Sequence, residues 1–254
     1  MATLWQREVI RYIRDRTRVV STLIQPVMFL VVFGTGLGET LASSNLGVNY
    51  IVFMYPGTIA MTVMGVGFFA TISTVWDRQF GFLKEILVAP IPRTAIALGK
   101  TAGAATMASV QALILLALAP IIGIALHGAW IPLLILFLVM LSLAVSGLGL
   151  LVASLMKTTE SFGILIQILL FPMFFLSGAF FPLTRVPTWM AILSYINPLT
   201  YGVDAFRQVI LNGDVSAETA ARIFLFPLHL DGLFLLGFTA FTTLAAVIAF
   251  NRRD

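Results

Sequence analysis

The stretch WDRQFGFLKEILVAPIPR, residues 76–93, is a charged segment between two long apolar runs. Its apolar residues recur at i, i+3 and i+7, which predicts a short helix with one apolar stripe. Pro90 and Pro92 end that helix because neither has a backbone N–H to donate. The segment is too short and too charged to cross a bilayer, yet too apolar on one side for a solvated loop, so we expect it to meet a partner surface. The stripe consists of Phe80, Leu83 and Leu87, and the polar residues around it are Asp77, Arg78, Lys84 and Glu85.

The composition of the whole chain is that of an integral membrane protein. Of its 254 residues, 59% are hydrophobic and only 10% are charged, and the mean hydropathy is +1.02. A helix needs roughly 20 apolar residues to cross the hydrocarbon core, and long continuous runs favour helices over the alternating strands of a barrel. We therefore expect an all-α membrane protein, with residues 1–254 forming a single transmembrane domain. The six expected spans are residues 19–37, 50–75, 101–126, 131–155, 162–181 and 230–250.

Positive charges gather on one side of these expected spans. Cytoplasmic loops carry an excess of Lys and Arg near the ends of membrane helices. The connections after the first and third runs contain neither residue, and the long connection after the fifth contains only three arginines. The bias predicts a multi-pass protein with both termini and residues 76–93 in the cytoplasm. The residues that set it are Arg7, Arg11, Arg14, Arg16, Arg18, Arg78, Lys84, Arg93, Lys100, Lys157, Arg252 and Arg253.

The N-terminal residues 1–18 have the pattern of an amphipathic helix. Four arginines lie on one helical face, and Trp5, Val9, Tyr12 and Ile13 lie on the opposite one. This pattern predicts an interfacial helix along the cytoplasmic membrane surface. A basic tail that only orients the first span is the simpler alternative, because the charge bias alone would explain the arginines.

The connection at residues 182–229 is too apolar for a solvated loop. Residues 187–196 and 198–211 each predict a short helix that begins with proline, and Asn197 is the expected N-cap of the second. Neither is long enough to cross the membrane, so we expect re-entrant or interfacial pieces at the outer face. Asp204 and Arg207 are three residues apart on the second piece, which predicts an ion pair with a structural role more often than a contact with a substrate.

The sequence offers no set of residues for catalysis or for binding a cofactor. Gly99-Lys100-Thr101 resembles the end of a phosphate-binding loop, but Thr94 stands where the first glycine is needed. The two histidines lie at span ends without a carboxylate at helical spacing, and there is no cysteine. The spans also hold no ionisable residue away from their ends, which disfavours proton-coupled antiport. We expect no enzyme, no metal site, no bound cofactor and no nucleic-acid partner.

Two motifs give the chain a family resemblance. They are FGFLKEILVAPIPR after the second expected span and LSGAFFPLTRVPTWMAILSYINPLTYGVDAFR after the fifth. With six spans and cytoplasmic termini, the chain resembles the permease subunit of ABC transporters of the type-2 export family, in particular the branch of drug-resistance and lipo-oligosaccharide exporters. The resemblance implies a bacterial cell membrane, a second copy of the permease, and two copies of a separate ATPase subunit that binds ATP and Mg²⁺.

The resemblance also implies roles for particular residues. In the family the segment after the second span is a coupling helix that docks in a groove of the ATPase. This implies docking by Asp77, Arg78, Phe80, Gly81, Leu83, Glu85 and Leu87, with Pro90 as the end of the element. The outer helices would cap the translocation path. The possible polar contacts along that path are Gln25, Gln167, Asn197, Tyr201, Asp204 and Arg207.

The expected function is ATP-driven export of an amphipathic, lipidic or drug-like substrate out of the cytoplasm or the inner leaflet. Two alternatives remain open. The first is a membrane subunit that anchors or regulates a complex without transporting anything. The second is a secondary transporter that works without an ATPase. The polar residues named for the path would equally serve to join helices to one another.

Overall fold

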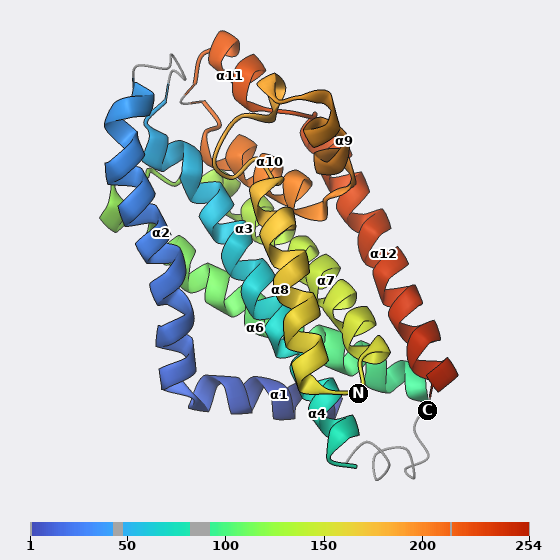
Figure 1. The fold of residues 1–254 in the computed structure, drawn as a ribbon. Helices are drawn as coiled ribbons and strands as arrows, with labels where there is room; N and C mark the ends of the chain where they lie inside the picture. The colour runs from blue at the N-terminus through green and yellow to red at the C-terminus, as the bar shows by residue number, and fades with distance from the viewer. Residues whose placement is uncertain (1, 43–47, 82–91, 214, 254) are drawn as a thin grey trace.

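The computed structural model describes residues 2–42, 48–81, 92–213 and 215–253, and every regular element within them is a helix. Most of the long helices run side by side, α1 lies across one end of the bundle, and α9, α10 and α11 gather at the opposite end (Figure 1). We call these the α1 end and the α11 end. In chain order the helices are α1 (Ala2–Arg14), α2 (Arg16–Ala42), α3 (Tyr50–Ala70), α4 (Ile72–Gln79), α6 (Arg93–Ala117), η1 (Ala119–Ile122), η2 (Gly128–Trp130), α7 (Ile131–Leu155), α8 (Thr159–Phe175), η3 (Leu183–Arg185), α9 (Thr188–Ile196), α10 (Pro198–Ile210), α11 (Ala217–Ile223) and α12 (Leu228–Arg253).

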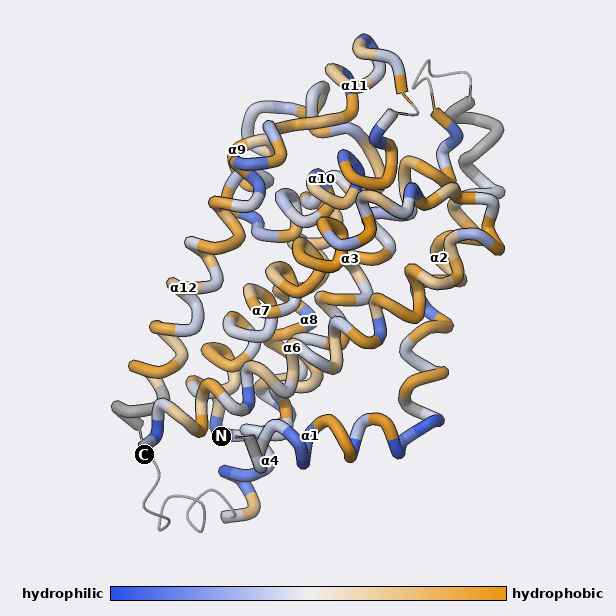
Figure 2. The backbone as a smooth tube through the Cα atoms, turned by 180° about the vertical axis from the view of Figure 1, so that it is seen from behind, coloured by the Kyte–Doolittle hydropathy of each residue, from blue (hydrophilic) through white to orange (hydrophobic). Residues whose placement is uncertain are grey.

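Five stretches of helix within the described residues are long and apolar enough to cross a membrane. Hydrophobic residues dominate these long helices, whereas α1 alternates between hydrophilic and hydrophobic residues (Figure 2). The predicted run at 131–155 coincides with α7, and the runs at 19–37 and 230–250 lie within α2 and α12. The five candidate spans are Val19–Gly36, Tyr50–Gln79, Arg93–Ile122, Gly128–Leu155 and Ala217–Ala249.

The helix of the fifth expected span ends earlier than the sequence predicts. Helix α8 has only 17 residues and ends at Phe175, so it falls below the length of the other candidate spans. The chain turns immediately afterwards, and Gly178 has a φ of +77°, a conformation that favours glycine. The carbonyl of Gly178 accepts a hydrogen bond from Arg207, which fixes the turn against α10. Residues 176–181 therefore belong to this turn and not to the membrane-crossing helix.

The helix of the third expected span begins earlier than the sequence predicts. Helix α6 begins at Arg93, directly after Pro92 in extended conformation, and not at Thr101. In the sequence analysis Lys100 lies just before the third expected span and counts among the cytoplasmic positive charges. In the structure Lys100 is only 3% exposed and forms an ion pair with Asp77. That pair allows the charged side chain to lie inside the helix bundle.

The interior of the bundle centres on α3 and α7. Both pack against α6, and α7 also packs against α10 and α12. Large apolar side chains fill this centre, among them Phe53, Tyr55 and Phe68 of α3 and Leu138 of α7. The α3 backbone approaches the turn after α8 so closely that a Cβ on Gly57 would lie 2.3 Å from the Cβ of Ala179. A side chain at position 57 is therefore incompatible with this packing.

The N-terminal helix ends earlier than predicted. The sequence pattern extends it through residue 18, but α1 ends at Arg14 and α2 begins at Arg16, with a break at Asp15. After this break the chain turns from the end of the bundle into the first long helix (Figure 1). The predicted apolar face is divided, because Tyr12 is buried at 2% exposure whereas Ile13 is 58% exposed.

The two short helices predicted from proline and asparagine signals are present. Helix α9 covers Thr188–Ile196 and α10 covers Pro198–Ile210. Asn197 is the N-cap of α10, as predicted, because its side chain accepts a hydrogen bond from the backbone N–H of Leu199. Helix α11, a helix of seven residues that Ser216 caps, was not predicted.

Candidate functional site

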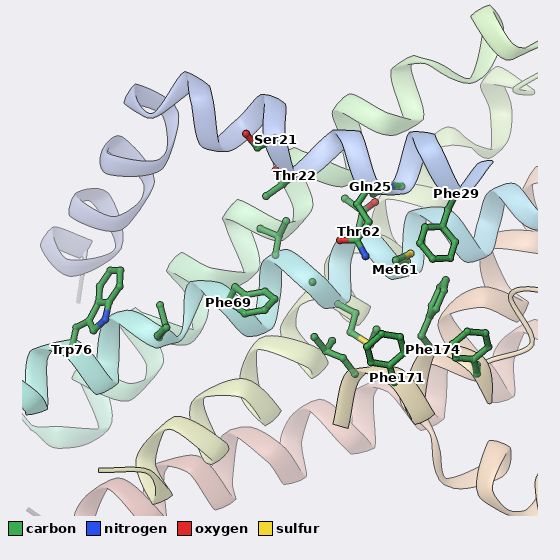
Figure 3. A pocket seen from close by; sticks show the side chains of 17 residues that line it. Ser21, Thr22, Gln25, Phe29, Met61, Thr62, Phe69, Trp76, Phe171 and Phe174 are labelled. Atoms are coloured by element: carbon green, nitrogen blue, oxygen red, sulfur yellow. The ribbon is translucent and has the colours of Figure 1, made fainter. Parts of the chain in front are cut away.

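A groove of about 590 Å³ lies between α2, α3 and α8. Helix α3 contacts both α2 and α8, and the groove runs over its surface between them (Figure 3). Side chains from α2, from α3 and α4, and from α8 point into it (Figure 3). They are Ser21, Thr22, Gln25, Pro26 and Phe29 of α2; Met61, Thr62, Met64, Gly65, Val66, Phe69, Ile72 and Trp76 of α3 and α4; and Leu170, Phe171, Phe174 and Phe175 of α8.

The wall of the groove is largely aromatic. Phe174 packs edge-on against Phe29 across the groove, with ring centroids 6.1 Å apart. Phe171 stacks on Phe175 along α8 and is 66% exposed, so this part of the wall is open to the surroundings. A mostly apolar cavity of this volume lies within the range of roughly 300–1,000 Å³ that small-molecule sites occupy.

Few polar groups in the groove are available to a ligand. The hydroxyls of Ser21, Thr22 and Thr62 donate to backbone carbonyls of their own helices. Gln25 is exposed, and its side-chain amide has no hydrogen-bond partner among the described residues. An amide in this setting offers two donors and one acceptor to whatever enters. Gln25 is one of the residues expected as polar contacts along the translocation path, and the structure places it in the groove.

Trp76 marks the end of the groove nearest α1. It also lines a second, much smaller cleft between α1 and the junction of α3 and α4, where Glu8, Arg11 and Tyr12 come together. The guanidinium of Arg11 lies 5.9 Å from the centroid of the Trp76 ring, which is a cation–π contact. The groove therefore ends beside a positive charge.

A network of charges joins α1, α4 and α6 at the same end. The ammonium of Lys100 lies 2.5 Å from Asp77, and Arg7 lies 3.5 Å from the same carboxylate and 2.8 Å from Glu8. Burial alone would lower the pKa of Arg7, but the carboxylates of Glu8 and Asp77 raise that pKa above its ordinary value. Asp77 thus stands between two cations from two different helices.

The two residues after Asp77 bind α4 to α7 and α8. The guanidinium of Arg78 donates to the carbonyls of Ser154 and Met156, each at 2.9 Å, at the C-terminus of α7. A cation at this position satisfies carbonyls that have no partner within the helix and suits the helix dipole. The side chain of Gln79 accepts hydrogen bonds from the N–H and the hydroxyl of Thr159 at the start of α8. Helix α4 therefore contacts three long helices through side chains that are consecutive in sequence.

Helix α1 is held to the bundle by hydrogen bonds as well as by charge. The Tyr12 hydroxyl donates to the side chain of Gln111 at 2.5 Å, and Gln111 in turn donates to the carbonyl of Val19. The indole N–H of Trp5 donates to Thr106. Because Gln111 is fully buried, its amide fixes α1 and the start of α2 against α6.

A separate polar cluster lies at the α11 end. Asp204 accepts hydrogen bonds from the backbone N–H groups of Leu225 and Phe226, and Gln208 donates to both Asp204 and Asp231. These contacts hold the chain where it enters α12. The cluster closes the α11 end of the bundle with polar contacts among α10, α12 and the segment before α12.

Arg207 is committed to other partners, so the ion pair predicted between Asp204 and Arg207 is not made. The guanidinium donates to the carbonyls of Gly178 and Phe53 and lies 4.0 Å from the centroid of the Phe53 ring. The reason is that each side chain has other partners, since Asp204 accepts hydrogen bonds from the backbone N–H groups of Leu225 and Phe226 and from Gln208.

The structure separates the residues expected along a path. Gln25 lies in the groove, whereas Gln167 is exposed on α8 and is not among the groove residues. The other four lie at the α11 end, where Asn197 donates to the carbonyl of Met173 and Tyr201 donates to the carbonyl of Tyr195. The remaining two of the four are Asp204 and Arg207.

The residues expected to meet a partner fall into two groups. Asp77 and Arg78 have the contacts given above, Phe80 follows the end of α4 with 78% of its side chain exposed, and Gly81 adopts a φ of +79°. The others lie outside the described residues. They are Leu83, Glu85, Leu87 and Pro90.

Sequence reasoning missed three residues that organise the site. Lys100 was placed in a loop, and Gln208 and Gln111 were not considered. Gln111 lies inside the third apolar run, which is the same signal that drew attention to Gln25. Trp76 was not predicted as a site residue, because its position beside both clefts depends on helices distant in sequence.

Comparisons with known proteins agree with this architecture. Residues 1–211 match the family described as ABC-2 type transporter. The chain is 30% identical over 207 residues to the putative transport permease ycf38 of Cyanophora paradoxa, a match that covers 80% of this chain and 71% of that protein. It is 32% identical over 219 residues to the probable multidrug ABC transporter permease YbhR of Escherichia coli strain K12, covering 82% of this chain and 55% of YbhR.

A third relative is nodulation protein J of Rhizobium leguminosarum bv. viciae, which is 27% identical over 218 residues, or 84% of this chain and 83% of that protein. The several apolar helices and these relatives together indicate a multi-pass membrane protein. Because the family match extends over most of its length, the chain belongs to the ABC-2 type transporter family.

Proposed function

We propose that this chain is the membrane-spanning permease subunit of an ATP-driven exporter that moves an amphipathic, lipidic or drug-like substrate. Family membership supports this proposal, as do relatives named as transport permeases, one of them as a probable multidrug ABC transporter permease. The observation that carries it is the set of bonds at α4. Asp77, Arg78 and Gln79 connect the start of residues 76–93 to four other helices, so a displacement there would reach the walls of the groove.

In this proposal, residues 76–93 are a coupling element that docks on a separate ATPase. The exposed Phe80 ring supports docking, because a large aromatic side chain at 78% exposure gains from burial against a partner. Asp77 and Arg78 hold the base of the element, Gly81 redirects the chain after α4, and Leu83, Glu85 and Leu87 complete the docking surface up to Pro90. Two ATPase subunits bind ATP and Mg²⁺, and this chain performs no catalysis of its own.

The proposed topology has six spans, with α8 as the short fifth. The turn at residues 176–181 and the helices of residues 182–229 then form re-entrant pieces at the outer face. Both termini and residues 76–93 lie on the cytoplasmic side of a bacterial inner membrane, and residues 1–18 run along the surface of that side. The arginines of α1 and the position of α1, α4 and the end of α12 at one end of the bundle support this orientation (Figure 1).

Substrate movement in this proposal follows a switch of the paired permeases between inward-facing and outward-facing states. A second copy of this chain completes the path. The groove beside α3 forms part of that path and Gln25 supplies a polar contact within it. Gln167, Asn197, Tyr201, Asp204 and Arg207 remain candidates for contacts farther along.

Reconstitution tests the function and separates it from its alternatives. The chain is purified with its ATPase, placed in vesicles, and assayed for movement of a fluorescent amphipath with ATP or with a non-hydrolysable analogue. ATP-driven export predicts that the amphipath moves when ATP is present and does not move with the non-hydrolysable analogue. Movement without any ATPase would identify a secondary transporter, and ATPase binding without movement would identify an anchor or regulatory subunit.

The Glu85→Lys variant tests the docking element in the same vesicles. Reversing this charge is expected to reduce both ATPase co-purification and export. The matched control is Glu218→Lys, because Glu218 is exposed on α11 at the other end of the bundle. Unchanged assembly and export in the Glu85→Lys variant would remove this residue from the docking surface.

A further inference from the structure

The groove between α2, α3 and α8 has an apolar wall that faces the side-chain amide of Gln25. Phe69, Phe171 and Phe174 line the apolar part, and Gln25 faces them from α2 (Figure 3). The hydroxyls near Gln25 already donate to helix carbonyls, whereas its amide has no partner within the described part of the chain. A ligand that fits this surface is therefore mostly apolar and carries at least one hydrogen-bonding group.

The end of the groove beside α1 carries a positive charge that forms no ion pair within the described residues. Trp76 is shared by the groove and the small cleft that Arg11 lines. Arg11 is exposed, and no carboxylate of the described residues forms an ion pair with it. The neighbouring acids are already occupied, because Glu8 pairs with Arg7 and Asp77 pairs with Arg7 and Lys100.

The rest of this region adds to the positive charge. Residues 1–18 contain five arginines and two acids, and Arg14 and Arg16 are exposed on either side of the break between α1 and α2. The second acid, Asp15, stands at this break, and its backbone N–H and carbonyl join the hydrogen bonding of α1 and α2. The apolar groove thus ends in a basic region, an arrangement that suits an amphipath with an acidic headgroup.

We propose that this groove binds an anionic amphipath, with its acidic headgroup beside Arg11 and Trp76 and its apolar tail between α3 and α8. The inference rests on the proposed function, because it assigns a charge and a shape to the cargo of the same groove. Charge complementarity selects this occupant over a cationic or neutral amphipath of equal length. A guanidinium forms strong, charge-assisted hydrogen bonds with phosphate or carboxylate oxygens, and a trimethylammonium headgroup would be repelled there.

Gly65 provides a way to close the groove without disturbing the fold. It lines the groove from α3, and a Cβ at this position would meet no heavy atom within 4 Å. A leucine here therefore projects into the groove and occupies the space of the tail. Gly237 of α12 also has open space around its Cβ but lies in a different helix outside the groove, so Gly237→Leu is the matched control.

The test measures binding to the full chain alone, in nanodiscs of phosphatidylcholine. Dodecyl phosphate that carries bromine on the two carbons next to its headgroup quenches the fluorescence of a tryptophan beside that headgroup. The Trp76→Phe variant supplies the background from the other three tryptophans. Dodecyltrimethylammonium and dodecyl maltoside, brominated at the same carbons, are the cationic and the neutral probe for comparison. We expect half-maximal quenching by the phosphate at about tenfold lower mole fraction than by the other two probes.

Variants of the arginine separate charge recognition from hydrophobic partition. Arg11→Gln is expected to bring the phosphate within about twofold of the neutral probe, and Arg11→Lys to retain most of the preference. Arg14 lies on the same helix but outside both clefts. Arg14→Gln is expected to leave the preference for the phosphate probe within about twofold of wild type, because exposed charges are screened. Gly65→Leu is expected to abolish the Trp76-dependent quenching by all three probes, and Gly237→Leu to preserve it.

Two results would overturn the proposal. Equal quenching by the phosphate and trimethylammonium probes would show that the groove does not recognise an acid. Unchanged quenching in Gly65→Leu, with a loss of dimer in native mass spectrometry, would show that a second copy of this chain occupies the groove. Because binding is measured without an ATPase, either failure leaves ATP-driven export standing, whereas loss of export with binding intact would count against the proposed function alone.

Discussion

Replacing Asp77 by asparagine would remove the carboxylate that pairs with Lys100 in the charge network at the α1 end. Lys100 is 3% exposed and Asp77 is 15% exposed by side chain, so the lysine would remain buried beside a neutral amide. Removing one partner of a buried ion pair costs about 3–5 kcal/mol. Asparagine still accepts one hydrogen bond and Asp77 keeps some contact with water, so we expect the lower limit of that range, about 3 kcal/mol.

The second cation contributes little to this figure. Arg7 is 40% exposed and lies 3.5 Å from Asp77, and exposed pairs of this kind are worth about 0–1 kcal/mol. The double variant Asp77→Asn/Lys100→Met removes the stranded charge as well. It is expected to recover all but about 1 kcal/mol, because a methionine fills the space of the lysine stem without a charge.

The assay is unfolding of the purified chain in mixed micelles of a mild detergent and sodium dodecyl sulfate, monitored by tryptophan fluorescence. Glu218→Gln is the control, because Glu218 and Arg222 form an exposed pair on α11 that contributes at most about 0.5 kcal/mol. The reasoning is refuted if Asp77→Asn unfolds at the same detergent fraction as wild type. It is equally refuted if the double variant is no more stable than the single one.

Four further changes have expected outcomes of different kinds. Gly57→Ala is expected to lower the free energy of unfolding by about 1–3 kcal/mol in the same assay, because the new Cβ meets Ala179, whereas Gly65→Ala should not destabilise the chain. Tyr12→Phe leaves Gln111 without its hydroxyl partner and should cost about 1 kcal/mol and speed hydrogen exchange in α1, while unchanged exchange would contradict this anchoring. Asp204→Asn weakens the charge-assisted hydrogen bonds to the segment before α12 and should cost about 1.5–3 kcal/mol, measured against wild type at the same pH. Phe80→Ala should leave the unfolding curve within about 0.5 kcal/mol of wild type but reduce the ATPase that co-purifies, so a stability loss without a change in co-purification would count against docking.

The sequence predicted the long helices where composition alone determines them. Residues 131–155 are almost entirely apolar and contain no charged residue, and α7 has those bounds. Short helices α9 and α10 were also predictable, because proline at a first turn and Asn197 as a cap act locally. In each case the signal lies within the element itself.

Tertiary contacts explain the elements that were wrong. The start of α6 was placed too late because the apolar run begins only after Lys100, whereas the helix begins at Arg93 and buries Lys100 through its ion pair with Asp77, which is distant in sequence. Helix α8 was extended too far because the apolar residues after Phe175 look like more span, whereas Arg207 fixes a turn there. Neither partner can be identified from a pattern in one segment.

The groove could be predicted only in part. Gln25 was singled out as a polar side chain in an apolar run, which is a local signal, and it lies in the groove. The position of Trp76 beside Arg11 depends on the packing of α1 against α6, through Tyr12 and Gln111. No periodicity in the sequence reports that contact, so the basic end of the groove emerges only from the fold.

Photocrosslinking at position 80 tests most directly whether a separate ATPase drives this chain through residues 76–93. A benzophenone amino acid replaces Phe80, which is 78% exposed after α4, and in a control replaces Trp189, which is 62% exposed on α9 at the other end of the bundle. After irradiation of native membranes, we predict that position 80 yields a covalent product containing an ABC ATPase, identified by mass spectrometry, and that position 189 yields none. No ATPase in the product from position 80, or an equal amount from position 189, would contradict the account.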